Sequence, residues 1–177
     1  MESTDGLSGG CLTEGFSPTC EVQASDVTVT RDTSTGTDYE EIVERCLQRQ
    51  CGQLGLELRY QVFVGEKPTG GQHRIDWELV DESDANRRGL VSCKVQNVAG
   101  TAEEKVIFEV IKLLHALDQD SRYKRAWLVL GGTGWSPGMK RFLMGDLKTW
   151  LPSMDARVVI VADTDSLLNV NLSLSES

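Results

Sequence analysis

Apolar residues recur along the chain with two periods, and these periods predict helices and strands in a mixed order. A helical spacing follows the capping-box pattern Thr37-Asp38-Tyr39-Glu40 and ends near Gly52 or Gly55. Three short strand-like segments come next, at 56–64, 73–80 and 89–95. The remaining pattern predicts a helix over 101–117 that begins with a second capping box (Thr101–Glu104), a buried strand at 126–130, a helix over 139–151 and a last strand at 158–161.

The order of these elements indicates the class of fold. The order is α-β-β-β-α-β-α-β, with the first strands close enough along the chain to form antiparallel hairpins. The later strands are separated by helices, as parallel strands joined by crossover connections require. We therefore expect an α/β domain with a mixed central β-sheet flanked by helices.

The two ends of the chain differ in composition from this domain, which we expect over residues 37–168. Residues 1–36 are rich in serine, threonine, glycine and acids, and we expect a flexible acidic segment there and a polar tail at 169–177. The first segment holds six acids and one arginine, so it contributes −5 to the net charge of −9. A protein that coats DNA would be basic, but a domain left with −4 can still collect its bases on one face.

The cysteines and the apolar runs indicate the cellular compartment in which the protein is expected. Five cysteines occur without the spacing of a CxxC or Cys/His motif, which favours reduced thiols in the cytoplasm. The longest apolar run is far below the ~20 residues of a membrane helix. The N-terminus also lacks the basic and apolar regions of a secretory signal. We expect a cytoplasmic protein without a membrane segment.

Two residues on neighbouring predicted strands are the strongest candidates for chemistry. Asp76 follows Ile75 in a strand suited to burial, and Lys94 lies on the next strand. Taken alone, a buried aspartate is commonly a turn-former or a salt-bridge partner, and a strand lysine is commonly a solvated edge residue. Together they can hold a divalent cation and activate a water molecule beside a phosphodiester.

These residues stand in a longer pattern that resembles a known family. His73-Arg74-Ile75-Asp76 ends with the aspartate, and Ser92-Cys93-Lys94-Val95-Gln96 begins sixteen residues later. Preceded by the helix that carries Glu40, this pattern resembles the PD-(D/E)XK nucleases over residues 37–165. The resemblance implies a restriction-endonuclease-like core and a Mg²⁺-dependent endonuclease acting on DNA. It also implies that Asp76 and the carbonyl of Cys93 bind the metal, and that Lys94 assists the attacking water.

The chain departs from the family pattern at Ser92, where the second acid is expected. Some members of the superfamily take this acid from the following helix, which here offers Glu103, Glu104 and Glu109. Glu104 belongs to the capping box, and Glu109 lies at the flank of the apolar stripe. Glu103 precedes Val106 and Ile107 and is expected to face the sheet, so we expect Glu103 to complete the metal site. The alternative is that Glu103 only complements the helix dipole.

Several residues have weaker functional interpretations beside ordinary structural ones. Glu40 is expected to assist metal binding, or is a simple first-turn acid. Gln96 is expected to orient a water or a phosphate, or is a plain polar strand residue. His73 and Arg74 are candidates for phosphate contact, and Trp135, in a loop, is a candidate for stacking on a base.

Two functions remain open at this point. The first is a DNA endonuclease that recognises its target as a homodimer or through a partner subunit, because the chain has little room for a separate recognition domain. The second is a catalytically weak or inactive nuclease-like subunit that binds DNA or has a structural role in a larger complex. Ser92 and the acidic charge favour the second, whereas the presence of both Asp76 and Lys94 favours the first. An α/β small-molecule hydrolase is less consistent, because neither histidine has a Ser-His-Asp pattern around it.

Overall fold

The computed structural model describes residues 36–98, 102–154 and 157–174. Along the chain the strands are β1 (Leu56–Glu66), β2 (Gln72–Asp81), β3 (Arg88–Val95), β4 (Tyr123–Gly131) and β5 (Val158–Val161). The longer helices are α1 (Gly36–Leu54) and α2 (Ala102–Gln119), and the shorter ones are α3 (Pro137–Arg141), η1 (Phe142–Asp146), α4 (Leu147–Trp150), η2 (Pro152–Met154) and α5 (Thr164–Leu167). The expected flexible segment, apart from Gly36, and Thr101 of the second capping box lie outside the described residues.

The strands form one five-stranded sheet in the order β1-β2-β3-β4-β5. The pairs β1–β2 and β2–β3 are antiparallel, whereas β3–β4 and β4–β5 are parallel. Short connections join the antiparallel strands, because the chain reverses direction from one strand to the next. Helical crossovers join the parallel strands, because the chain must return to the same end of the sheet before the next strand begins. The expected α/β fold with a mixed sheet flanked by helices is confirmed.

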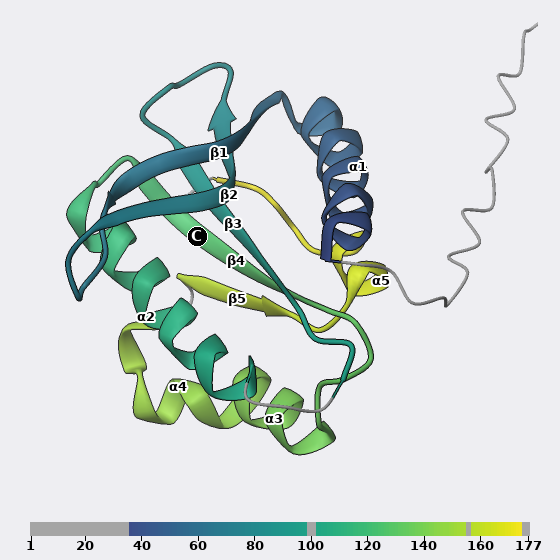
Figure 1. Ribbon diagram of the computed structural model, residues 1–177. Helices are drawn as coiled ribbons and strands as arrows, with labels where there is room; N and C mark the ends of the chain where they lie inside the picture. The colour runs from purple at the N-terminus through teal and green to yellow at the C-terminus, as the bar shows by residue number, and fades with distance from the viewer. Residues whose placement is uncertain (1–35, 99–101, 155–156, 175–177) are drawn as a thin grey trace, which may run out of the picture. The chain divides into compact units, whose positions relative to one another are not determined.

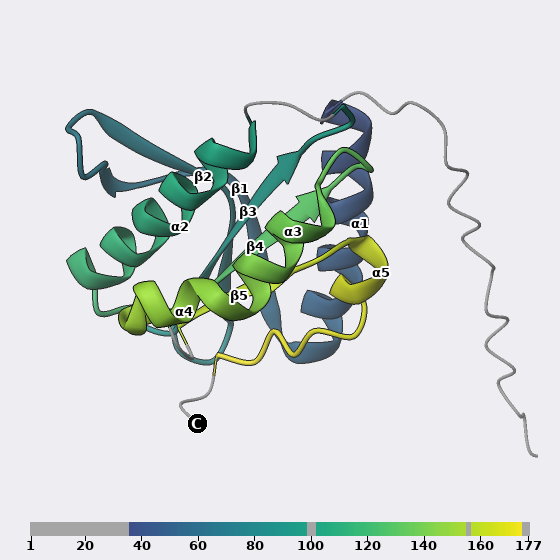
Figure 2. The same ribbon diagram turned by 90° about the horizontal axis from the view of Figure 1, so that it is seen from below.

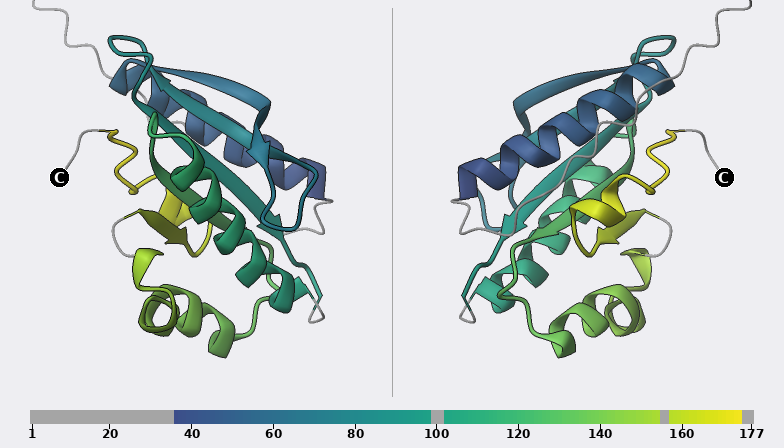
Figure 3. Two further views of the ribbon diagram at one scale, coloured as in Figure 1. Left: turned by 90° about the vertical axis from the view of Figure 1, so that its left-hand side faces the viewer. Right: turned by 90° about the vertical axis from the view of Figure 1, so that its right-hand side faces the viewer.

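Helices cover both faces of the sheet (Figure 1, Figure 3). One face packs against α2 and the continuous helical segment α3–η1–α4, and the other packs against α1 and α5. Figure 2 shows α2 and the α3–α4 segment on the near side of the sheet, with α1 and α5 beyond it. The strands β3 and β4 in the middle of the sheet are therefore buried on both sides, which agrees with their apolar runs.

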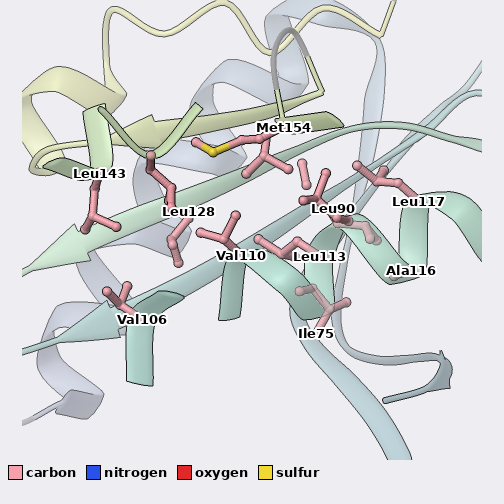
Figure 4. Packing of buried hydrophobic residues seen from close by; sticks show 14 of the residues in the cluster. Ile75, Leu90, Val106, Val110, Leu113, Ala116, Leu117, Leu128, Leu143 and Met154 are labelled. Carbon is pink, nitrogen blue, oxygen red and sulfur yellow. The ribbon is translucent and has the colours of Figure 1, made fainter. Parts of the chain in front are cut away.

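The core on the α2 face holds the elements that carry the candidate site. Val106, Val110 and Leu113 of α2 pack against Leu90 of β3 and Leu128 of β4 (Figure 4). Full burial of one such side chain stabilises the fold by roughly 1.5–3 kcal/mol. This packing fixes the rotation of α2 about its axis, and it determines which polar residues of the helix face the end of β3.

The helix predicted over 139–151 begins two residues earlier and is not uniform. Ser136 caps it, because its hydroxyl accepts a hydrogen bond from the Met139 backbone N–H at 3.1 Å and Pro137 occupies the first turn. The middle five residues, η1, form a π-helical turn. The short helix α5 after β5 was not predicted; Asp163 caps it by accepting a hydrogen bond from the Ser166 N–H at 2.7 Å.

The expected polar tail from Asn169 is corrected by the structure as far as residue 174. Leu172 and Leu174 are 0% and 3% exposed, and both belong to the core on the α1 face. Gly89 provides the space for this packing, since a Cβ there would lie 2.6 Å from the Trp127 ring and 2.8 Å from Leu174. The two leucines alternate with polar residues, and such a short pattern did not separate a packed segment from a loose one.

None of the helices among the described residues is long and apolar enough to cross a membrane. Cys46, Cys51 and Cys93 are free thiols in this part of the chain. Burial raises the pKa of Cys51 to about 11 and that of Cys93 to about 12, so both thiols stay protonated near neutral pH.

Candidate active site

Asp76 lies where strand β2 separates from strand β3. The ladder between the two strands runs from Val80↔Arg88 to Trp77↔Val91, and Asp76 is the next residue of β2 beyond it. Its carboxylate still reaches β3, because Oδ2 accepts the Cys93 backbone N–H at 2.8 Å and lies 3.1 Å from the Ser92 hydroxyl. The aspartate therefore binds the edge of β3 that the ladder leaves open.

Lys94 places one ammonium group among several oxygen atoms. Its Nζ donates to the hydroxyl of Ser92 and to the carbonyl of Cys93, each at 3.0 Å. The same Nζ lies 3.7 Å from Oδ2 of Asp76 and 3.6 Å from Oε2 of Glu109. The Lys94 side chain is 37% exposed, so the cluster opens to solvent on its lysine side.

Glu109 is the second carboxylate of this cluster. It comes from the buried face of α2, is 4% exposed, and its Oε1 lies 3.0 Å from the Ser92 hydroxyl. Burial by itself would raise the pKa of Glu109, but the ammonium groups of Lys94 and Lys112 and the Ser92 hydroxyl bring that pKa below its usual value. Glu109 is therefore ionised at neutral pH despite its burial.

Glu103 lies elsewhere, contrary to the expectation from the sequence. Its carboxylate accepts the Ser136 backbone N–H at 2.6 Å and lies 3.2 Å from the Ser136 hydroxyl. It thus joins the start of α2 to the start of α3. Glu109 follows Glu103 by six positions, which places the two residues about 120° apart around a helix. The rotation that buries Glu109 therefore turns Glu103 away.

Glu40 of α1 faces the cluster from the other side of the sheet. Burial raises its pKa, and the charge of Asp76 adds to that rise, whereas Lys94 opposes it. The three groups are therefore close enough to interact electrostatically, and a role of Glu40 in metal binding stays a prediction.

Gln96 anchors a loop, and the structure does not place it toward the cluster. Its side-chain amide donates to the Gly134 carbonyl at 2.8 Å, and its own carbonyl accepts the Gly134 N–H at 2.7 Å. Gly132 has a φ of +83°, and a Cβ there would lie 2.4 Å from the Gln96 carbonyl oxygen. The expectation that Gln96 orients a water or a phosphate is replaced by a role in holding the loop after β4.

Two of the three residues expected to contact nucleic acid are buried. His73 is 1% exposed, and Trp135 is 5% exposed with its indole N–H bound to the Gly131 carbonyl at 2.6 Å. Neither can reach a strand outside the protein, so both expectations are corrected. Arg74 is exposed, and it lies opposite Phe63, itself 52% exposed, in the ladder of the β1–β2 hairpin.

The donor set of the cluster fits a hard divalent cation. Mg²⁺ binds oxygen ligands and is commonly held by one or two carboxylates together with waters and substrate phosphate. The cluster offers two carboxylates, Asp76 and Glu109, and the Cys93 carbonyl around the position of a cation, the Lys94 ammonium. Among the described residues, no three His, Cys, Asp or Glu side chains are grouped to hold a metal by themselves. The set fits a metal that keeps waters and shares a phosphate.

Fold and cluster together are those of a nuclease-type domain: a mixed sheet whose second and third strands bring an aspartate and a strand lysine together. The chain belongs to the PD-(D/E)XK nuclease superfamily, whose domain it matches over residues 31–171. Members of this superfamily are usually nucleases that act on nucleic acid and typically use divalent metals. A comparison with curated proteins gives no match.

Proposed function

We propose that this protein is a metal-dependent nuclease that hydrolyses phosphodiester bonds in DNA. One observation supports the proposal most directly: the Lys94 ammonium lies within 3.0–3.7 Å of oxygen atoms from Asp76, Glu109 and the Cys93 carbonyl. A cation, two carboxylates and a carbonyl at the open end of a strand are the groups that metal-assisted hydrolysis of a phosphodiester needs.

Asp76, Glu109 and the Cys93 carbonyl would hold the metal, with Glu40 adding negative charge from the α1 side. When bound, Mg²⁺ would polarise the phosphate and lower the pKa of a water molecule. Lys94 would hold the attacking water and offset the negative charge that develops on the phosphate oxygens. The Ser92 hydroxyl lies 3.1 Å from Oδ2 of Asp76 and 3.0 Å from Oε1 of Glu109. It would therefore hold the two carboxylates in a fixed position relative to each other.

The exposed pair Phe63 and Arg74 supports a nucleic-acid contact on the β1–β2 hairpin. Arg74 precedes Asp76 by two residues, so a strand bound at the cluster would pass close to the hairpin. A guanidinium can bind a phosphate, and an aromatic ring can stack on an unpaired base. Recognition of a target would need a second copy of the chain or a partner subunit, because the described residues make up a single sheet and the helices that cover it.

A cleavage assay with the full chain tests this function. Supercoiled plasmid would be incubated with the protein and Mg²⁺, with and without chelator, for wild type and for Asp76→Asn, Lys94→Ala and Glu109→Gln. Glu104→Gln is the matched control, since Glu104 is an exposed acid on the same helix. We expect metal-dependent cleavage that the three site variants lose and the control keeps.

Two results decide against the proposal. Cleavage that survives in all three site variants would show that the activity does not belong to this cluster. DNA binding without cleavage, under every metal tried, would instead select the nuclease-like subunit without catalytic activity, which the net charge of −9 and Ser92 already favour.

A further inference from the structure

Lys112 is a second lysine at the cluster, and the sequence pattern did not single it out. It follows Glu109 by three residues on α2, so both side chains leave the same face of the helix. Its Nζ forms an ion pair with Oε2 of Glu109, and the Lys112 side chain is only 17% exposed. Lysine is rarely this buried unless its charge is paired, so the pair with Glu109 accounts for its position.

The Glu109 carboxylate is held at both of its oxygens. Ser92 lies at Oε1, 3.0 Å away, and Lys112 binds Oε2, with Lys94 3.6 Å from the same atom. Because both oxygens of the carboxylate have partners, the carboxylate is held in one orientation, and in this orientation it faces β3. Without Lys112, a side chain that is 4% exposed has little water to replace the partner lost at Oε2, so the carboxylate would lose this fixed orientation.

His73, on β2, interacts electrostatically with both members of this pair but supplies no competing charge. His73 of β2 is 1% exposed, and neither ring nitrogen has a hydrogen-bond partner among the described residues. Burial lowers its pKa and the charge of Lys112 lowers it further, so the imidazole is neutral near neutral pH. His73 therefore does not compete with Lys112 for Glu109.

We propose that Lys112 is a positioning residue of the candidate metal site, which holds the Glu109 carboxylate directed toward Ser92 and Lys94. The inference rests on the proposed function, because it takes Glu109 as a metal ligand. For the loss of Lys112, the proposal predicts a change in metal affinity that is opposite to the change expected from charge repulsion alone. By charge alone, removing a cation near the site would strengthen metal binding, whereas losing the group that orients a buried ligand would weaken it.

Metal binding measured without nucleic acid separates these effects. The full chain would be titrated with Mn²⁺, and free Mn²⁺ followed by electron paramagnetic resonance, for wild type, Lys112→Met, Lys112→Arg and Glu109→Gln. Lys105→Met is the matched control, because Lys105 is an exposed lysine on the same helix. We expect Lys112→Met to weaken Mn²⁺ binding about tenfold or more, the range typical for groups that orient metal ligands. Lys112→Arg keeps the charge and should recover most of the affinity, and Lys105→Met should match wild type.

The double variant Glu109→Gln/Lys112→Met adds a test of mechanism. If Lys112 acts through Glu109, the double variant binds Mn²⁺ as Glu109→Gln does, with no further loss. If Lys112→Met fails to give the circular dichroism of the folded protein, Lys112→Gln, which retains a polar N–H, is used in its place.

Each remaining outcome overturns a distinct statement. Unchanged affinity in Lys112→Met, while Glu109→Gln binds weakly, rejects the role of Lys112 and leaves the metal site intact. Tighter binding in Lys112→Met also rejects it and makes Lys112 a competitor of the cation. Wild-type affinity in Glu109→Gln rejects the ligand set of the proposed function, and this inference fails with it.

Discussion

The Oδ2 atom of Asp76 accepts the backbone N–H of Cys93 at 2.8 Å, at the point where the β2–β3 ladder ends. This bond ties the candidate metal ligand directly to the strand that carries Lys94. The aspartate thus has two functions in one atom: it satisfies a backbone donor of β3, and it faces the lysine ammonium 3.7 Å away. The geometry of the site depends on the strand edge as much as on its charged groups.

This double role predicts different results for two substitutions of Asp76. Asp76→Asn keeps an oxygen that can accept the Cys93 N–H but removes the charge, so activity should fall to background while the melting temperature changes little. Asp76→Ala leaves a partly buried donor unpaired, which should cost about 1–3 kcal/mol of unfolding free energy. Urea denaturation and plasmid cleavage, run on both variants, check the separation. Equal stability of the two would show that the Cys93 bond contributes nothing.

Glu103 is predicted to contribute to the stability of the fold and not to metal binding. Since its carboxylate accepts the Ser136 N–H, Glu103→Ala should lower the unfolding free energy by about 1–3 kcal/mol. The Mg²⁺ concentration needed for half-maximal cleavage should stay the same in Glu103→Ala, whereas Glu109→Gln should lose cleavage. A large rise in the Mg²⁺ requirement for Glu103→Ala alone would show that Glu103, and not Glu109, is the second carboxylate of the metal site.

Much of the fold was predictable because its elements have strong local periods. The apolar run of β3 and the alternating pattern of β1 placed both strands, and the short hairpin connections made the first half of the sheet antiparallel. Asp76 and Lys94 were predictable as neighbours because both follow from strand positions alone. The segment 169–174 was not, since its burial depends on a space that Gly89 leaves beside Trp127.

The choice between Glu103 and Glu109 required the rotation of α2, which local periodicity gives only approximately. Both acids border the apolar stripe of the helix, and side-chain packing on the sheet decides which one is buried. The signal that was available is Lys112, one turn after Glu109: a lysine on the buried side of a helix needs a charged partner nearby.

Arg74 should contribute to DNA binding mainly through phosphate. Arg74→Ala is expected to weaken DNA affinity and to reduce the slope of log K against log salt by about one, as loss of one phosphate contact does. Arg49→Ala, an exposed arginine on α1, is the matched control and should leave the slope unchanged. Fluorescence anisotropy with a labelled duplex at several salt concentrations measures both. Identical slopes for the two variants would show that Arg74 makes no phosphate contact and that the β1–β2 hairpin is not part of the DNA-binding surface.

Residues 1–36 should reduce DNA affinity through their charge. They contribute −5 of the net −9, and repulsion of this kind is screened by salt. Deletion of residues 1–35, which leaves the start of α1 intact, should therefore tighten DNA binding at low salt and have less effect at high salt. A parallel thermal melt serves as the control, and a deleted protein that melts far below the intact chain would show that the segment contributes to the core.

His73 makes the stability of the domain sensitive to acid. Burial lowers its pKa below the usual value, and the charges of Lys112, Lys67 and Lys94 add to this effect, whereas Glu109 opposes it. In the unfolded chain the imidazole titrates near its ordinary pKa of about 6.5. Between the two pKa values the unfolded chain binds more protons, so the stability that is fully present above about pH 6.5 is lost as the pH falls toward the folded pKa.

The variant His73→Leu removes this titration and places a side chain without an ionisable group at the same buried position. Both ring nitrogens lack partners among the described residues, so the substitution leaves no partner of theirs unpaired. We expect the unfolding free energy of His73→Leu to fall less steeply than that of wild type between pH 7 and pH 5, with the two curves closest in slope above pH 7. Urea denaturation at a series of pH values provides the measurement. If wild type and His73→Leu lose stability in parallel as the pH falls, the acid sensitivity arises from carboxylates, and His73 is a neutral core residue at every pH tested.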